Sequence, residues 1–283
     1  MVGDRSSPPY VRRNRIPSAA HRIGRGDGPV NPLSPPPQAG AVTDEYEAVF
    51  WDVGGVILDL SSVGRARRAF VEDLADRYDR DPDAAIEAYR AALSEHFAAR
   101  EGTEYDSAAE GYAAAVEAVA RREVPESEWR PAMLAASERA LEPVEGAPEA
   151  IRRLADAGLT LAVVSDIDTW EAERFLEWFG IADAFDAVVT SESVGRRKPD
   201  PAMFQTAVDA TGADPARTAM VGDRYEHDME GGTRAGLTTV ALDGSAAERA
   251  PDPGDGYRVD DPAVDFVADS PLDVPRILGV ESP

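Results

Sequence analysis

Four short stretches of this sequence carry side chains whose types and order could perform chemistry on an anionic substrate. They hold acids, a hydroxyl and one amine, and three of them follow short apolar runs. The stretches contain Asp52 before Gly54-Gly55, Ser165 with Asp166, Lys198, and Asp223 with Asp228. If three of these carboxylates meet, they repel one another by about 4 kcal/mol per pair at an effective dielectric constant of 20. Such a site therefore needs cations.

Lys198 and a divalent metal ion could supply that positive charge. Carboxylate and carbonyl oxygens, without His or Cys, favour Mg²⁺, which keeps several waters and shares its coordination shell with substrate phosphates. With the phosphoryl charge neutralised, the carboxylate of Asp52 can attack phosphorus and form an aspartyl-phosphate that water then hydrolyses. The hydroxyl of Ser165 can donate a hydrogen bond to a phosphate oxygen. The residues therefore predict an Mg²⁺-assisted reaction at Asp52.

Alternating strands and helices must position these side chains. An apolar run ends at Asp52, and after Pro143 strands are predicted at residues 159–165, 185–189, 218–221, 237–242 and 266–268. Helices are predicted at residues 148–157, 169–179, 201–212 and 226–235, with a short one ending at Leu278. Asp168 and Glu171 have the spacing of a capping box for the second of these helices. The alternation indicates a doubly wound α/β fold with a parallel sheet, whose strand ends face one crevice.

A purely helical pattern interrupts this alternation between residues 61 and 141. Apolar residues recur there with helical spacing in four stretches, separated at Asp81-Pro82, Gly102-Thr103 and Pro125. We therefore expect an α/β core of residues 44–60 and 142–283, with an all-helical cap inserted at residues 61–141. The cap side chains that could reach a substrate are Arg65, Tyr89, His96, Tyr112 and Trp129, and core packing is the preferred interpretation for the three aromatic ones.

Residues 1–43 have a different composition from the rest of the chain. They contain Pro35-Pro36-Pro37, repeated Gly and Ser, and six Arg against two Asp, without apolar periodicity. A segment of this kind cannot bury enough apolar surface to offset the entropy cost of ordering. We expect a disordered basic tail.

The overall charge and the missing cysteines exclude several classes of function. The 283 residues include 53 Asp and Glu against 29 Lys and Arg, and the net charge of −24 argues against nucleic acid and anionic membranes as partners. The absence of Cys excludes disulfides and thiolate chemistry. No apolar run is long enough for a membrane helix, and no signal peptide is recognisable, so we expect a cytoplasmic protein with a salt-adapted acidic surface.

Lys198 is the single Lys of the sequence, which marks it as a position that needs a compact ammonium.

Taken together, the motifs resemble those of the haloacid dehalogenase-like (HAD) hydrolase superfamily. The resemblance rests on the segments Asp52-Val53-Gly54-Gly55-Val56, LAVVSD with Ser165, Lys198-Pro199-Asp200-Pro201, and Gly222-Asp223 through Asp228. It implies that Asp52 is both nucleophile and metal ligand. It further implies that the Gly54 carbonyl and Asp223 bind Mg²⁺, that Asp228 supports the metal, and that the phosphate contacts Ser165, Asp166, Lys198 and Gly55. The implied substrate is a small phosphorylated metabolite.

One position departs from the phosphatases of that superfamily and leaves three hypotheses open. Most phosphatases of that superfamily carry an acid two residues after the nucleophile, where this chain has Gly54. General acid–base catalysis typically contributes about 10²- to 10⁴-fold. A substrate with a good leaving group, or another acid such as Asp59, Asp166 or Asp168, could compensate for the missing one. The first hypothesis is a phosphatase. The second is a 2-haloacid dehalogenase, although such enzymes resemble Ser-Asn where this chain has Gly222-Asp223. The third is a non-catalytic protein that binds a phosphometabolite or a protein partner. A phosphonate-cleaving enzyme is disfavoured, because residues 61–141 contain no Lys.

Overall fold

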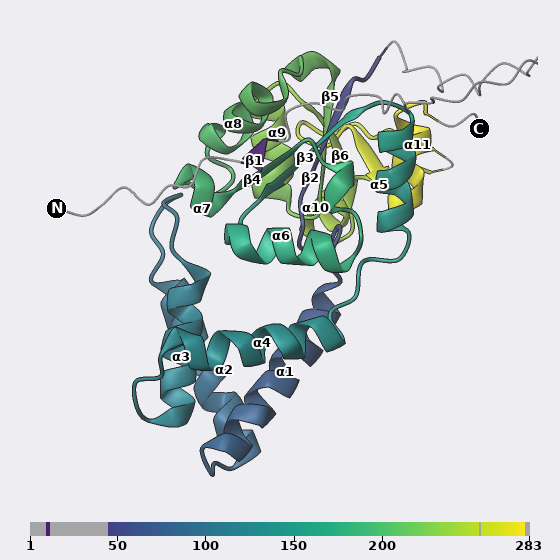
Figure 1. Cartoon of the computed structure of the whole chain (residues 1–283). Coiled ribbons are helices and arrows are strands. Elements are labelled where there is room, and N and C mark those ends of the chain that lie inside the picture. Colours follow the sequence, from purple (N-terminus) through teal and green to yellow (C-terminus); the bar gives the residue numbers. More distant parts are fainter. Residues whose placement is uncertain (1–9, 12–44, 255, 281–283) are drawn as a thin grey trace, which may run out of the picture.

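A seven-stranded sheet organises the chain (Figure 1). The computed structural model describes residues 10–11, 45–254 and 256–280. The strand order is β1-β4-β3-β2-β5-β6-β7, and all pairs are parallel except β1 with β4. The strands are β1 (Tyr10–Val11), β2 (Ala48–Trp51), β3 (Thr160–Ser165), β4 (Ala187–Thr190), β5 (Thr218–Gly222), β6 (Thr238–Leu242) and β7 (Phe266–Ala268).

The central strand β2 fixes the position of Asp52. All four residues of β2 are apolar and fully buried, as expected for a strand covered on both faces. Trp51 lies opposite Val163 of β3 and Val221 of β5, so the three strands end at the same edge. The backbone N–H of Asp52 donates a hydrogen bond to the Val221 carbonyl at 3.0 Å. Asp52 therefore lies at the C-terminal edge of the sheet, where the crevice is predicted.

Helices cover both faces of the sheet. One buried cluster joins β2, β3 and β5 to α5, α6 and α11, and a second joins the opposite face to α8. The helices of this α/β part are α5 (Ala147–Asp156), α6 (Thr169–Trp178), α7 (Ser191–Val194), α8 (Pro201–Thr211), α9 (Glu230–Arg234), α10 (Gly244–Arg249) and α11 (Val274–Ile277). This arrangement confirms the predicted α/β fold with a parallel, doubly wound sheet.

Residues 60–140, which we call the helical insertion, form four helices with a core of their own (Figure 1). They are α1 (Leu60–Arg77), α2 (Pro82–Ala98), α3 (Ala108–Ala120) and α4 (Glu126–Ala140). The apolar faces predicted from the sequence meet in this core, where Phe70 packs edge-on against Tyr89. Asp81 caps α2 by accepting a hydrogen bond from the Ala84 N–H, and Pro82 is the first residue of that helix. The breaks between the helices coincide with the predicted ones.

The structure contains four elements that were not predicted from the sequence. Tyr10 and Val11, which lie in the predicted tail, form β1 and pair with β4; the rest of that tail, residues 1–9 and 12–43, lies outside the described residues. The helix predicted at residues 226–235 begins with a π-helical turn, Tyr225–Met229, before α9. The short helices α7 and α10 were not predicted, because four to six residues are too few to show a periodic pattern.

The predicted capping box at Asp168 is wrong. Asp168 occupies the N-cap position of α6, but its side chain makes no hydrogen bond to that helix. The carboxylate instead accepts hydrogen bonds from the N–H groups of Ala108 and Ala109, each at 3.1 Å, and so caps α3 of the helical insertion. A sequence pattern cannot distinguish a local cap from one that acts between distant segments. Within the described residues, no helix is long and apolar enough to cross a membrane.

Candidate active site at the C-terminal edge of the sheet

Lys198 connects two acids that come from different strands. Its Nζ lies 2.8 Å from Oδ1 of Asp52 and 2.5 Å from Oδ1 of Asp228, and its side chain is fully buried. The charges of Asp228 and Asp52 raise the pKa of Lys198 above its ordinary value, although burial alone would lower it. Burial raises the pKa of Asp228, which the Lys198 charge opposes. These short contacts favour a charged ammonium between two carboxylates.

Asp228 is held from both sides. Its Oδ1 accepts a hydrogen bond from Lys198, and its Oδ2 accepts one from the backbone N–H of Arg224 at 2.9 Å. Gly222 makes this approach possible, since a Cβ at that position would lie 2.3 Å from the Cβ of Asp228. With both oxygens engaged, Asp228 positions Lys198 and the loop after β5.

Asp223 has a carboxylate oxygen that accepts no hydrogen bond from the described residues. One carboxylate oxygen of each of Asp52, Asp223 and Asp228 lies within 4.8 Å of the other two. Oδ1 of Asp223 is buried and has no hydrogen-bond partner among the described residues. Burial, together with the charges of Asp52 and Asp228, raises the pKa of Asp223 to about 7. A buried carboxylate oxygen of this kind needs either a proton or a cation.

The oxygen atoms around Asp223 fit a hard divalent cation. The carboxylates of Asp52 and Asp223 are adjacent, and the Gly54 carbonyl accepts no hydrogen bond from the part of the chain that the structure describes. Mg²⁺ prefers such oxygen ligands, with water completing its shell. The unpartnered Oδ1 of Asp223 is the observation that makes the donor set suitable for a metal.

Gly55 lies in a different environment from the one predicted. It was expected to contact the substrate, but it does not line the cavity, and its N–H donates to the Leu58 carbonyl at 2.9 Å. Its φ is +73°, and a Cβ at Gly55 would lie 2.5 Å from Oδ2 of Asp223. Glycine is therefore required here to make room for Asp223 and for the backbone conformation.

Ser165 and Asp166 follow β3 and line a cavity beside Asp52. Among the described residues, the hydroxyl of Ser165 makes no hydrogen bond, so it is free to contact a ligand. Asp166 accepts a hydrogen bond from the backbone N–H of Lys198 at 2.7 Å. Burial raises the pKa of Asp166, and the Lys198 charge opposes that shift. Asp166 therefore orients the segment that carries Lys198.

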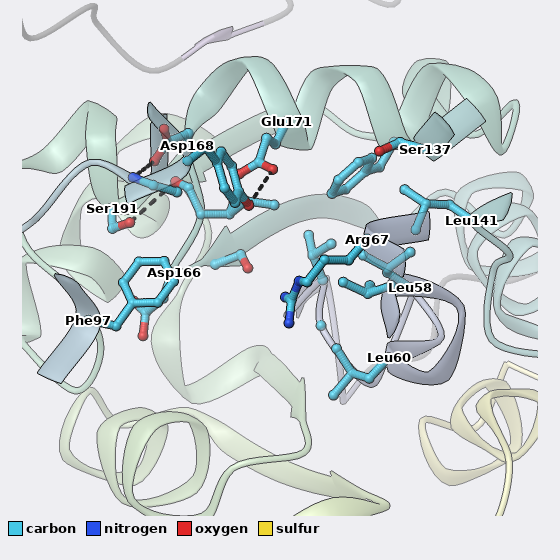
Figure 2. A pocket seen from close by; sticks show the side chains of 18 of the residues that line it. Leu58, Leu60, Arg67, Phe97, Ser137, Leu141, Asp166, Asp168, Glu171 and Ser191 are labelled. Carbon is cyan, nitrogen blue, oxygen red and sulfur yellow. Dashed lines mark hydrogen bonds between the residues drawn. The ribbon is translucent and has the colours of Figure 1, made fainter. Parts of the chain in front are cut away.

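The cavity lies between the sheet edge and the helical insertion and has a volume of about 400 Å³ (Figure 2). The polar end contains Asp52, Ser165, Asp166 and Asp223, whereas Lys198 and Asp228 lie behind them and do not reach the cavity. Lys198 therefore acts in this conformation through its ion pair with Asp52. The wall on the side of the helical insertion is mainly apolar and includes Leu60, Val63, Phe70, Phe97 and Met133.

Two acids at the N-terminal end of α6 connect the helical insertion to the α/β part (Figure 2). Asp168 caps α3 and also accepts a hydrogen bond from the Tyr105 hydroxyl at 2.7 Å. Glu171 accepts one from the Tyr112 hydroxyl at 2.9 Å. Burial and the charge of Asp168 raise the pKa of Glu171 to about 8, so this carboxyl is largely protonated at neutral pH. These contacts hold α3 over the cavity.

Three acids were predicted as replacements for the acid absent at Gly54, and one of them suits that role. Asp59 caps α1, and its hydrogen bonds from Ser61 lower its pKa. Asp168 lines the cavity but is occupied by its donors from the helical insertion. Asp166 lines the cavity next to Ser165 and has a raised pKa.

The side chains predicted to face a substrate from residues 61–141 divide into two groups. Tyr89 and Tyr112 line the cavity. Arg65 pairs with Glu142, Trp129 is buried in the core of the helical insertion, and the Nε2 of His96 lies 2.9 Å from the Ser107 carbonyl; none of these three lines the cavity. Arg67, which the sequence prediction missed, does line it. Its position two residues after Arg65 places it on another side of α1, which only the packing of that helix could reveal.

Comparison with known proteins agrees with this geometry. Residues 46–236 match the family model described as haloacid dehalogenase-like hydrolase. The chain is 36% identical over 146 residues to the pyrophosphatase PpaX of Halalkalibacterium halodurans. This match covers 51% of this chain and 64% of that protein. It is 39% identical over 101 residues to haloacid dehalogenase-like hydrolase domain-containing protein 3 of Bos taurus, covering 36% of this chain and 40% of that protein. The matched part thus spans less than two thirds of these curated relatives.

Solved structures show the same fold. A HAD phosphatase from Thermococcus onnurineus superposes with a TM-score of 0.60 at 22% identity, over 83% of this chain and 99% of that one. An L-2-haloacid dehalogenase from Xanthobacter autotrophicus gives a TM-score of 0.56 at 18% identity, over 84% of this chain and 100% of that one. Since the family model covers most of the chain, including the segments of Asp52, Ser165, Lys198 and Asp223, the protein belongs to the haloacid dehalogenase-like hydrolases.

Proposed function

We propose that this protein is an Mg²⁺-dependent phosphatase of a small phosphorylated metabolite and that it acts through an aspartyl-phosphate on Asp52. The observation that carries the proposal is the unpartnered, buried Oδ1 of Asp223 beside Asp52. A dehalogenase that works without a metal would have no need for a third carboxylate at this point. A phosphatase needs it to hold the cation that accompanies its anionic substrate.

In this proposal Asp52 is the nucleophile. Lys198 holds Oδ1 of Asp52 and compensates its charge, which leaves Oδ2 to attack phosphorus. The Ser165 hydroxyl, at the end of the neighbouring strand, donates a hydrogen bond to a phosphate oxygen. Asp166 and Asp228 fix the Lys198 segment through its N–H and its Nζ. The leaving oxygen then requires a proton. Asp166 would donate it, because this acid lines the cavity next to Ser165 and burial raises its pKa.

Asp52, Asp223 and the Gly54 carbonyl would hold the metal ion, which would supply charge compensation for the phosphoryl oxygens. Asp228 would support it from behind through the ion-pair network. The same oxygen set, with no His or Cys, argues for Mg²⁺ over transition metals.

The helical insertion would serve as the cap of this site. It forms one wall of the cavity and is connected to the α/β part through Asp168 and Glu171. Several relatives have phosphatase names: besides PpaX, the chain is 32% identical to the phosphoserine phosphatase of Thermus thermophilus over 46% of this chain and 62% of that protein. These names support a phosphatase as the class of enzyme, and the cavity volume of about 400 Å³ supports a small substrate.

Phosphate release from a panel of sugar phosphates, glycolate-type phosphates, nucleotides and acyl phosphates tests the proposal. The purified protein is assayed with Mg²⁺ at low and high salt, with chelator and with Asp52→Asn as controls. We expect Mg²⁺-dependent turnover of some of these esters and none by Asp52→Asn. Absence of turnover over the whole panel would contradict the phosphatase assignment. If Asp52→Asn then also bound beryllofluoride or vanadate as wild type does, a non-catalytic binding protein would be favoured.

Gly54 favours one alternative, a 2-haloacid dehalogenase, because those enzymes also lack the second acid and share the fold. The same Asp52 would then attack carbon and displace halide without a metal. Chloride release from 2-chloropropionate that is unaffected by chelator would establish this alternative in place of ours.

A further inference from the structure

Arg67 presents a positive charge inside the cavity, on the wall formed by the helical insertion. In Figure 2 its guanidinium extends into the open space between Asp166 and Leu60. Its neighbours on the same face of α1 are Leu60, Val63 and Phe70, which line the cavity as well. Arg67 is exposed to solvent, so its guanidinium is accessible to an anion that enters the cavity beside this apolar face.

Three other arginines line the cavity, and each is already engaged. Arg100 stacks on Phe97 and bonds to Asp106, Arg197 donates to the carbonyls of Gly102 and Glu104, and Arg224 pairs with Asp166. Arg67, by contrast, makes no hydrogen bond or ion pair with residues 10–11, 45–254 or 256–280. Its five N–H donors are available to a ligand.

The direction of α1 brings this guanidinium back toward Asp52. The helix begins at Leu60, whose side chain is so close to Gly54 that a Cβ there would lie 3.6 Å from Leu60 Cδ2. Arg67 lies about 10 Å further along the axis, at a rise of 1.5 Å per residue. Side chains of a helix tilt toward its N-terminus. The long Arg67 side chain therefore reaches back over the cavity and faces the polar end that contains Asp52.

We propose that Arg67 selects phosphate esters whose leaving group carries a second oxyanion, a carboxylate or another phosphate. This rests on the proposed phosphatase function of Asp52. With the phosphoryl group at Asp52, a short leaving group would lie along the apolar wall of Leu60 and Val63. Its terminal oxyanion would meet the planar donor pair of Arg67. In a protein with a net charge of −24, a second anion needs such a partner to enter.

Two matched substrate pairs test the proposal. 3-Phosphoglycerate and glycerol 3-phosphate share a skeleton and differ in the carboxylate, and fructose 1,6-bisphosphate and fructose 6-phosphate differ in the second phosphate. The variant is Arg67→Met, which keeps an unbranched apolar side chain but removes the guanidinium. The matched control is Arg68→Met, which removes the same charge from a neighbouring arginine that pairs with Glu72 outside the cavity.

For Arg67→Met we expect kcat/KM for the doubly anionic member of at least one pair to fall by about 10- to 100-fold, the effect of one lost charged hydrogen-bond pair. The member of the pair without the second anionic group should change by less than about threefold, and Arg68→Met should leave both unchanged. The pair that responds identifies the second anion as carboxylate or phosphate. Equal effects on both members of both pairs would overturn the proposal while leaving the phosphatase assignment intact.

Binding provides a readout that does not need turnover. Calorimetric titration of Asp52→Asn and of Asp52→Asn/Arg67→Met with the same four compounds, with Mg²⁺ present, should show a preference for a doubly anionic compound in the first protein. That preference should be lost in the second. If wild type hydrolyses none of the four esters, the phosphatase assignment fails for this panel, and the titration still decides the role of Arg67. No preference, or no binding of any of the four, would refute that role.

Discussion

Replacing Lys198 with Met is the perturbation whose effect the structure constrains most closely. The ammonium is fully buried and contacts Asp52 at 2.8 Å and Asp228 at 2.5 Å. Breaking a buried ion pair by removing one partner costs about 3–5 kcal/mol, because a buried charge is left without compensation. Here the acids Asp52, Asp223 and Asp228 would lose the buried ammonium that lies between two of them. We expect Lys198→Met to lower the free energy of unfolding by about 4 kcal/mol at pH 8 without metal.

The loss should depend on pH in a defined direction. The folded-state pKa of Asp223, about 7, already lies above its ordinary value, and burial raises that of Asp228 as well. Without Lys198 both rise further. Between pH 6 and 8 the folded variant then binds more protons than the unfolded chain, so its stability increases as the pH falls. One carboxyl that stays protonated across this range recovers about 1.4 kcal/mol per pH unit. Wild type recovers about half of this amount between pH 8 and pH 6, because its Asp223 titrates near pH 7. We therefore expect the penalty to fall to about 2–3 kcal/mol at pH 6.

Urea unfolding at pH 6 and pH 8, with and without Mg²⁺, measures these quantities. Mg²⁺ should recover part of the stability of the variant at pH 8 by replacing the missing positive charge. The double variant Lys198→Met/Asp228→Asn, which removes one uncompensated charge, should be about 2 kcal/mol more stable than Lys198→Met alone at pH 8. A loss below about 1 kcal/mol that is equal at both pH values would show that Lys198 does not compensate the acids, which refutes the reasoning.

Three further predictions concern the neighbouring positions. Titration calorimetry should show that Mg²⁺ binds wild type more weakly as the pH falls below about 7, because Asp223 takes up a proton there. Asp223→Asn should weaken Mg²⁺ binding at every pH. Mg²⁺ binding that is independent of pH would contradict the assignment of Asp223 as a metal ligand. A Cβ at Gly54 would have only Leu60 within 4 Å, at 3.6 Å. Gly54→Asp should therefore raise kcat for alkyl phosphates by about tenfold or more, whereas Gly54→Asn should not. Asp168→Ala removes the cap of α3 and the Tyr105 hydrogen bond, and it should lower the free energy of unfolding measured in urea by about 2–4 kcal/mol. Asp156→Ala, which replaces an acid at the end of α5, is the near-neutral control. A loss equal to that of the control would show that the Asp168 contacts are not stabilising.

The sheet and the polar end of the cavity were accessible from the sequence because both depend on local patterns. Apolar runs that end at Asp52, Ser165 and Gly222 identify strands, and the parallel topology brings their ends to one edge. The four helices between residues 60 and 140 follow in the same way from apolar periodicity.

Contacts between distant segments were not accessible. Asp168 has the local spacing of a capping residue, yet its carboxylate caps α3, sixty residues earlier in the chain. Arg67 could not be distinguished from the other arginines of α1, because its role depends on which side of the helix faces the cavity. Gly55 shows the same limit. A positive φ is expected for a glycine in a turn, but the sequence does not reveal that Gly55 also makes room for the carboxylate of Asp223.

The most direct test of the central claim is detection of a phosphoryl group on Asp52. Wild-type protein is mixed with Mg²⁺ and a substrate from the phosphate-release panel, quenched in acid within the first turnover, digested and examined by mass spectrometry, with Asp52→Asn treated in parallel. We predict the mass of one added phosphoryl group on the wild-type peptide that contains Asp52, its loss with chelator, and no modified peptide from Asp52→Asn. Phosphate release by wild type without this adduct, or an unchanged turnover rate in Asp52→Asn, would contradict the assignment of Asp52 as the nucleophile.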